Sequence, residues 1–210
     1  MSFQAWLAFA AATSVLLAIP GPTVMLVVSY ALSHGRRATL ATVAGVALGD
    51  FTALTCSVLG VGAVLAASAQ LFTAVKWIGA AYLIYLGVKL WRAPATLGEA
   101  AAVAAGAETR LGRILFHAFA VTALNPKGIV FFIAFLPQFL DPAQPMGPQI
   151  AVVTATFVGL AAANAGIYAL MASAARRAIR KPAVQIAVNR VGGTCLIGAG
   201  TLAVALGRNN

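Results

Sequence analysis

The chain has 210 residues, of which 61% are hydrophobic and 9% are charged. A soluble domain carries about 25% charged residues, so this composition excludes an ordinary soluble protein and indicates an integral membrane protein. The net charge of +10 does not indicate nucleic-acid binding, because the basic residues stand between apolar segments and form no recognition motif.

Six apolar stretches have the length of bilayer-spanning helices, each of which needs about 20 residues. They cover residues 3–33, 38–66, 70–92, 113–139, 149–175 and 188–207. The first stretch is too long for a signal peptide and is expected to remain as a helix. The sequence therefore predicts an all-α, polytopic membrane protein with about six transmembrane helices.

Basic residues fall mainly in alternate connections. Eleven of them flank the first, third and fifth connections, whereas only Lys76 and Arg208 stand on the opposite side. The eleven are Arg36, Arg37, Lys89, Arg92, Arg110, Arg113, Arg176, Arg177, Arg180, Lys181 and Arg190. The positive-inside rule places these connections in the cytoplasm, so both termini are predicted on the outer side of the membrane.

An Ala- and Gly-rich segment, 93–112, is expected to be a cytoplasmic linker between two three-helix repeats, 1–92 and 113–210. The pattern Gly-x3-Leu-Ile-x2-Gly occurs at 79–87 and again at 192–200. Three helices is an odd number, so the second repeat must be inverted across the membrane. The two halves form one membrane domain.

Two helix-breaking triplets interrupt the first and fourth apolar stretches: Pro20-Gly21-Pro22 and Asn125-Pro126-Lys127. Proline in a helix interior removes a backbone hydrogen bond and costs about 3 kcal/mol or more. In a membrane such breaks are tolerated where they are buried in protein or line a cavity. Corresponding breaks in inverted repeats are typical of secondary transporters, although each proline taken alone is also compatible with a packing kink.

Charged residues inside the predicted spans are few. Asp50 is the only acid there, and Lys127 is the only basic residue at the same depth. Counted from the nearest basic anchor at about 1.5 Å per residue, Pro22, Asp50, Lys127 and Asn164 all lie about 18 to 21 Å deep. Asp50 and Lys127 are predicted to pair with each other or with substrate and to carry a coupling proton. A purely structural ion pair is the alternative.

The breaks also create polar helix ends. A half-helix N-terminus attracts carboxylates, and unwound carbonyls suit ammonium groups or cations, so a zwitterionic amino acid matches both. Thr23, Asn125 and Asn164 are candidates for additional neutral hydrogen bonds to such a substrate.

Together these motifs resemble the LysE/RhtB-type amino-acid exporters. The resemblance extends over essentially the whole chain. It rests on Pro-Gly-Pro at 20–22, Gly45-x3-Gly49-Asp50, the segment 76–87, Leu-Asn-Pro-Lys-Gly at 124–128 with the two phenylalanines at 131–132, and Leu-Pro-Gln-Phe at 136–139. It implies a small permease of the bacterial inner membrane that exports amino acids with the proton gradient. Thr23 stands where the family often has Asn, and Ala118 where it commonly has Gly.

The sequence thus predicts a secondary exporter of small amino acids, neutral ones such as homoserine- or threonine-like or branched species. Expected partners are the amino acid, a proton and the lipid bilayer, with homo-oligomerisation left open. No cofactor, metal site, catalytic residue or nucleic-acid partner is expected. The main alternative is an exporter of a cation or other small solute with Asp50 as ion ligand. A membrane enzyme would need a nucleophile–base pair or a metal cluster, and the predicted spans offer neither. A purely structural subunit would leave Asp50 and Lys127 unexplained.

Overall fold

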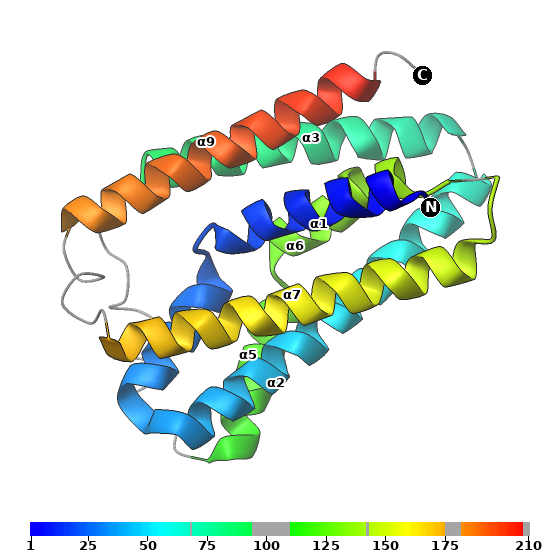
Figure 1. Ribbon diagram of the computed structural model, residues 1–210. Helices are drawn as coiled ribbons and strands as arrows, with labels where there is room; N and C mark the ends of the chain where they lie inside the picture. The colour runs from blue at the N-terminus through cyan, green and yellow to red at the C-terminus, as the bar shows by residue number, and fades with distance from the viewer. Residues whose placement is uncertain (68, 94–109, 142, 175–181, 208–210) are drawn as a thin grey trace.

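The protein is a bundle of helices. The computed structural model describes residues 1–67, 69–93, 110–141, 143–174 and 182–207, and these residues form helices and no strand. In chain order they are α1 (Phe3–Ala18), α2 (Pro22–Ala67), α3 (Ala69–Trp91), α5 (Leu111–Ala123), α6 (Pro126–Ala134), the 3-10 helix η1 (Leu136–Phe139), α7 (Met146–Ala174) and α9 (Pro182–Gly207) (Figure 1). The predicted all-α class is confirmed. Most of the predicted linker 93–112 lies outside the described residues.

Several helices have the character of membrane spans. Among the described residues, Pro22–Gly60 and Met146–Ala172 are long and apolar enough to cross a bilayer. The pair Leu111–Ala123 and Pro126–Ala134 makes a third span if the two helices, bent by 44°, are counted together. Phe3–Ala18 and Trp77–Trp91 are apolar but shorter. The chain is therefore a polytopic membrane protein, and six complete spans remain a prediction.

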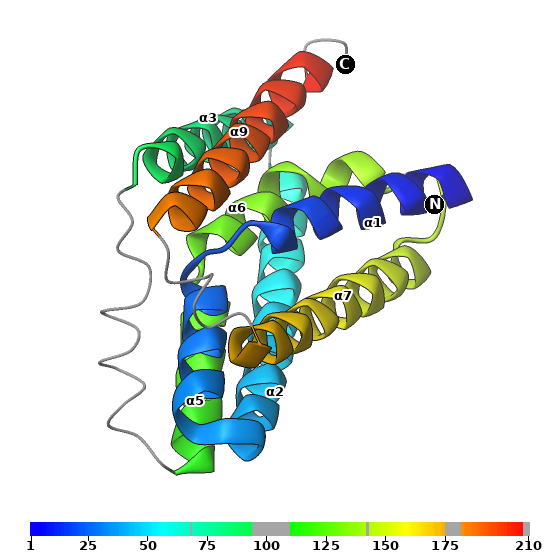
Figure 2. The same cartoon turned by 60° about the vertical axis from the view of Figure 1, so that its left-hand side comes forward.

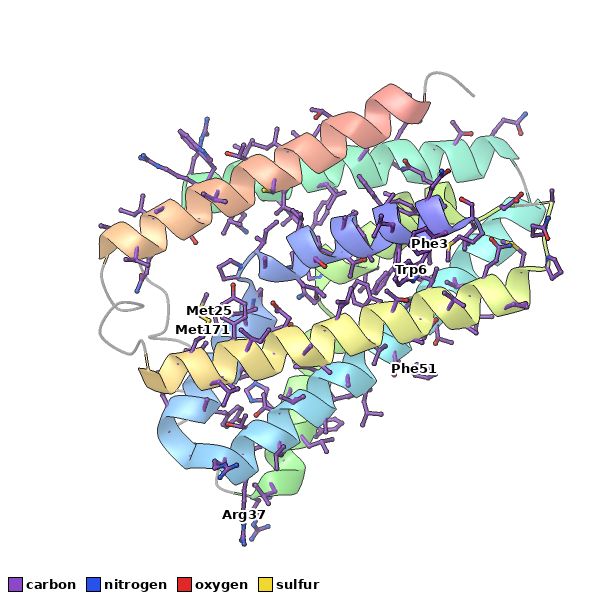
Figure 3. The ribbon with its side chains drawn as sticks, viewed as in Figure 1. Phe3, Trp6, Met25, Arg37, Phe51 and Met171 are labelled. Atoms are coloured by element: carbon purple, nitrogen blue, oxygen red, sulfur yellow. The ribbon has the colours of Figure 1, made fainter. Side chains whose placement is uncertain are left out.

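The outer surface of the bundle is apolar. Large hydrophobic side chains such as Phe3, Leu40, Leu124 and Leu170 are more than two-thirds exposed. Figure 3 shows Phe51 and other side chains pointing outward from the helices, with Arg37 at one end of the bundle. In water such a surface is unfavourable, whereas in a bilayer it faces lipid tails.

The first predicted connection is a kink and not a loop. Helix α2 continues from Pro22 to Ala67 through this region and turns sharply at Gly35, whose φ of 71° and ψ of −162° are strained for residues with a Cβ. The expected stretches 3–33 and 38–66 are therefore divided differently: the first consists of α1 and the beginning of α2, and α1 ends at Ala18.

Helix α2 packs closely against α5. A Cβ built on Gly45 would lie 2.8 Å from the Cβ of Ala118 and would clash with the carbonyl oxygen of Leu115. Close by, the hydroxyl of Tyr30, which is fully buried, lies 3.0 Å from Nδ1 of His117. These contacts hold α2 and α5 against each other (Figure 2).

Gly45→Ala is expected to destabilise the protein by about 1 to 3 kcal/mol, because the added methyl group overpacks the contact with α5. Gly159→Ala is the matched control, since nothing lies within 4 Å of a Cβ built there and alanine favours the helix by about 0.5 to 1 kcal/mol. Thermal unfolding of the purified variants in detergent measures both effects. Equal midpoints for the two variants would contradict this packing.

Helices α3 and α9 form a second unit. Gly87 and Gly193 face each other so closely that a Cβ on Gly193 would lie 2.5 Å from the Gly87 carbonyl oxygen. This unit contacts the rest of the described bundle mainly through α6, α1 and the neighbouring end of α2 (Figure 2). A core of aromatic rings, including Phe9, Phe131 and Phe157, joins α1, α6 and α7.

Candidate functional site

The break after α1 leaves backbone carbonyls without their helical partners. In an α-helix each carbonyl accepts from the N–H four residues later. Leu16 and Ala18 would accept from residues 20 and 22, and both of these are prolines, which have no N–H. Gly21 lies between them and joins α1 to α2, which begins at Pro22. The Pro-Gly-Pro sequence therefore exposes the C-terminal carbonyls of α1 to other partners.

Side chains from two other helices donate to these carbonyls. Nζ of Lys127 on α6 donates to the carbonyl oxygens of Leu16 at 3.0 Å and Ile19 at 2.8 Å. On α7, Nδ2 of Asn164 donates to Leu17 at 3.1 Å, and the hydroxyl of Tyr168 donates to Ala18 at 2.7 Å. Four consecutive carbonyls thus accept from side chains outside their own helix, and Leu16 also accepts from the Ile19 N–H at 3.3 Å. These donors reduce the cost of open carbonyls in a membrane.

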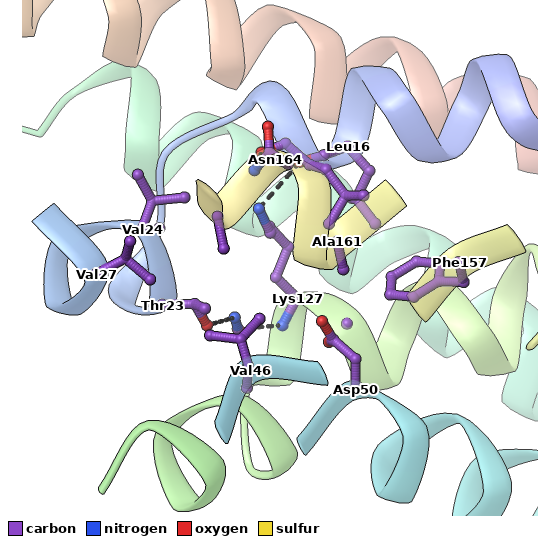
Figure 4. A pocket seen from close by; sticks show the side chains of 15 residues that line it. Leu16, Thr23, Val24, Val27, Val46, Asp50, Lys127, Phe157, Ala161 and Asn164 are labelled. Atoms are coloured by element: carbon purple, nitrogen blue, oxygen red, sulfur yellow. Dashed lines mark hydrogen bonds between the residues drawn. The ribbon is translucent and has the colours of Figure 1, made fainter. Parts of the chain in front are cut away.

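The second break lies beside the first. Asn125 is the N-cap of α6: its side-chain oxygen accepts from the backbone N–H of Lys127 at 3.1 Å, and Pro126 occupies the first turn. The amide nitrogen of Asn125 donates to the Thr23 hydroxyl at 3.2 Å, and Thr23 lies 3.3 Å from the Thr122 hydroxyl. The N-terminal turns of α2 and α6 are therefore joined by a polar bridge (Figure 4).

Asp50 reaches the same place from α2. Its side chain is 7% exposed and has no hydrogen bond to another described residue. It interacts electrostatically with Lys127, but no direct ion pair joins the two among the described residues. The predicted contact between Asp50 and Lys127 is therefore a proximity of charges within one cavity, because the lysine ammonium group lies on the α1 carbonyls.

A cavity of about 40 Å³ lies at the meeting point of the two breaks. Five residues predicted from the sequence line it, together with Gly21 of the first break; the five are Thr23, Asp50, Asn125, Lys127 and Asn164. Apolar side chains supply most of the remaining wall: Leu16, Leu17, Val24, Val27, Val46, Phe157, Ala161 and Ala165. Pro20, Pro22 and Pro126 do not line the cavity; they set the backbone around it.

Tyr168 is a site residue that the sequence analysis missed. It stands four residues after Asn164, and Phe157, Ala161, Asn164 and Tyr168 follow the spacing of one helix face. That spacing is the signal that places Tyr168 on the cavity side of α7. Tyrosine in a membrane protein is more often assigned to the interface belt, which is why this position gave no functional prediction.

Tyr168→Phe is expected to lower transport by about threefold to tenfold, because it removes one neutral hydrogen bond worth about 0.5 to 1.5 kcal/mol from the α1 carbonyls. Tyr85→Phe, on the exposed face of α3, is the matched control and should leave transport unchanged. Initial rates of solute release by cells expressing each variant measure the effect, and equal rates would remove Tyr168 from the site.

Comparison with known proteins finds relatives among membrane proteins and efflux proteins. The chain is 35% identical over 202 residues to a membrane protein of Vibrio cholerae, covering 96% of this chain and 97% of that protein. It is 31% identical over 202 residues to the homoserine/homoserine lactone efflux protein of Salmonella typhimurium, again covering 96% of this chain and 97% of that protein. The leucine efflux protein of Salmonella choleraesuis is 31% identical over 127 residues, which is 60% of this chain and 59% of that protein. No solved structure matches. Residues 14–207 match the family described as LysE type translocator, and the chain belongs to this family.

Proposed function

We propose that this translocator is a secondary exporter of small neutral amino acids, located in the bacterial inner membrane and driven by the proton gradient. The observation that carries the proposal is the meeting of both helix breaks at one cavity with a buried acid and a buried base. The relatives named for homoserine and leucine efflux support an amino acid with an uncharged side chain.

The polar groups of the cavity suit a zwitterion. The first turn of α6 presents the positive end of a helix dipole, which favours a carboxylate. The C-terminal carbonyls of α1 and the carboxylate of Asp50 favour an ammonium group. The wall between them is apolar, with Val24, Val27 and Phe157 at the cavity. A charged substrate side chain would lose its hydration there without a partner.

Alternating access by two inverted repeats is the transport mechanism that fits this arrangement. Each half of the chain contributes one broken helix to the cavity, and the third helices of the halves, α3 and α9, pack on each other. The limited contact of this α3–α9 unit with the other described helices supports movement of one body against another. Such movement opens a midplane site to one side at a time. The distribution of basic residues supports a position of both termini on the outer side.

Asp50 is the proposed carrier of the coupling proton. Its carboxyl group is buried beside the cavity and is free of hydrogen bonds to described residues, so it is available to a proton or to the substrate. A carboxylate at this depth is costly when it lacks a partner, and protonation relieves that cost when the substrate has left.

Release from cells preloaded with labelled homoserine, threonine and leucine tests the proposal. Cells expressing the protein should release at least one of these faster than cells with an empty vector, and an uncoupler should abolish the difference. Release that resists the uncoupler would contradict proton coupling. Absence of release for every amino acid would contradict the proposed substrate class and favour a cation or another solute bound at Asp50.

A further inference from the structure

We propose that Lys127 is an internal surrogate for the substrate's amino group: its ammonium occupies the subsite formed by the carbonyls of Leu16 and Ile19, and the exported amino acid must displace it. This inference deepens the proposed function and takes its substrate class from it. It assigns the ammonium subsite to named backbone atoms and assigns Lys127 a role in the empty transporter.

The chemistry of the subsite is that of a primary ammonium group. Nζ of Lys127 donates to Leu16 at 3.0 Å and to Ile19 at 2.8 Å, and a third N–H remains for another acceptor. The α-ammonium of an amino acid has the same three donors and the same charge. Both acceptors lie at the C-terminal end of α1, where the helix dipole is negative. The carbonyls that bind the lysine ammonium therefore also suit the ammonium group of a substrate.

The position of the lysine favours the displacement. Lys127 lines the cavity of about 40 Å³ and occupies part of the space in which a substrate would bind. A Cβ built on Gly21 would lie 3.7 Å from Nζ and 3.9 Å from Cε, so the end of the lysine fills the space beside the first break. Movement of this flexible side chain is the simplest way to admit a substrate.

Asp50 offers the displaced ammonium a second position. It lines the same cavity and has no hydrogen bond to another described residue. Because it already attracts Lys127 electrostatically, the lysine can exchange two carbonyls for one carboxylate without leaving the cavity. Substrate and lysine then share one negative region made of Asp50 and the α1 carbonyls.

The exchange has a consequence for the transport cycle. An unpaired carbonyl inside a membrane is costly. The carbonyl of Leu16 also accepts from the Ile19 N–H at 3.3 Å, whereas that of Ile19 depends on an ammonium donor, either the substrate or Lys127. The empty transporter can therefore return to its starting conformation with the Ile19 carbonyl paired. Solutes that lack an ammonium group do not displace the lysine, which sets selectivity for amines.

Chemical rescue of Lys127→Ala tests the subsite without measuring transport. This substitution removes three carbons and one nitrogen, which together correspond to n-propylammonium. The purified variant in detergent should show a thermal midpoint that rises with n-propylammonium, on the order of 5 °C at about a hundredfold excess over Kd. Propan-1-ol lacks the charge and tetramethylammonium lacks N–H donors, so neither should raise the midpoint comparably.

Two matched variants control the rescue. Lys127→Met removes the charge but keeps the cavity filled, and Lys89→Ala removes an exposed lysine at the end of α3. Neither should respond to n-propylammonium. A response of Lys127→Ala that propan-1-ol reproduces, or no response at all, would overturn the proposal.

A second variant keeps the proposal testable if Lys127→Ala does not survive extraction. Pro20→Ala restores the N–H that donates to Leu16 in a continuous helix, so it competes with Lys127 for that carbonyl. Acetylation of Lys127, measured by mass spectrometry relative to Lys89, should be severalfold faster in Pro20→Ala than in the wild type. An unchanged ratio would contradict the contact between Lys127 and Leu16.

The two proposals fail in different ways. If n-propylammonium rescues Lys127→Ala but cells release no amino acid, the carbonyl subsite is supported and its natural ligand is another primary amine. If amino acids are exported but rescue is absent, the exporter is supported and the surrogate role of Lys127 is wrong.

Discussion

Export by the Lys127→Met variant is expected to fall at least about a hundredfold. The substitution removes two hydrogen bonds from a charged donor, each worth about 1.5 to 3 kcal/mol, and each 1.4 kcal/mol corresponds to about tenfold in rate. It also leaves the buried carboxylate of Asp50 without its nearby positive charge. The initial rate of labelled amino-acid release, corrected for the amount of protein in the membrane, measures the loss.

Lys89→Met is the matched control for this variant. Lys89 lies in the last turn of α3 and is exposed, so its loss should leave release near the wild-type rate. Normal membrane insertion of Lys127→Met, together with lost release, supports a role in transport. Release at more than about half of the wild-type rate would exclude Lys127 from the mechanism.

The second large effect is expected for Asp50→Asn, which should also lower export at least about a hundredfold. Asparagine keeps the size of the side chain but neither carries the negative charge nor exchanges the coupling proton. Breaking a buried interaction between charges by removing one partner costs about 3 to 5 kcal/mol, because the other charge stays buried. Release of amino acid from preloaded cells, with the proton gradient present and then collapsed by an uncoupler, measures both the rate and its coupling.

Asp141→Asn is the control for Asp50→Asn, because Asp141 lies in the connection after η1 and outside the cavity. It should not change the rate. If Asp50→Asn retains a normal rate and the uncoupler still abolishes it, the proton is carried elsewhere. If the rate stays normal and becomes insensitive to the uncoupler, Asp50 is confirmed as the coupling residue but not as a substrate ligand.

Local sequence patterns predict much of the architecture. Apolar stretches predict helices at the observed positions, because lipid requires every backbone polar group to be paired within its own segment. The break at Pro20 and Pro22 is equally local, since proline lacks the N–H that a helix needs. The turn at Gly35 was less visible: the charged residues after it favoured a loop, whereas glycine lets α2 change direction without ending.

The residues of the candidate site could be predicted from the sequence, whereas their contacts could not. Asp50, Lys127, Asn125, Thr23 and Asn164 are recognisable because polar groups in apolar spans are expensive and need partners. Depth counted along each helix predicts that they share a level. It does not predict which groups touch, because that depends on how each helix is rotated toward its neighbours. Tyr168 was missed because tyrosine is usually assigned to the interface belt. Its contact could not correct this assignment, because its partner, Ala18, is 150 residues away in the sequence.

The amino-acid sequence by itself determined that this chain is a helical membrane protein with two broken helices and one acid and one base at the same depth. These are properties of composition, of proline chemistry and of distance along a helix. Only the tertiary structure decided where the lysine ammonium lies. The carbonyls of Leu16 and Ile19 hold it, in place of a direct ion pair with Asp50, because packing brings the first turn of α6 against the open end of α1.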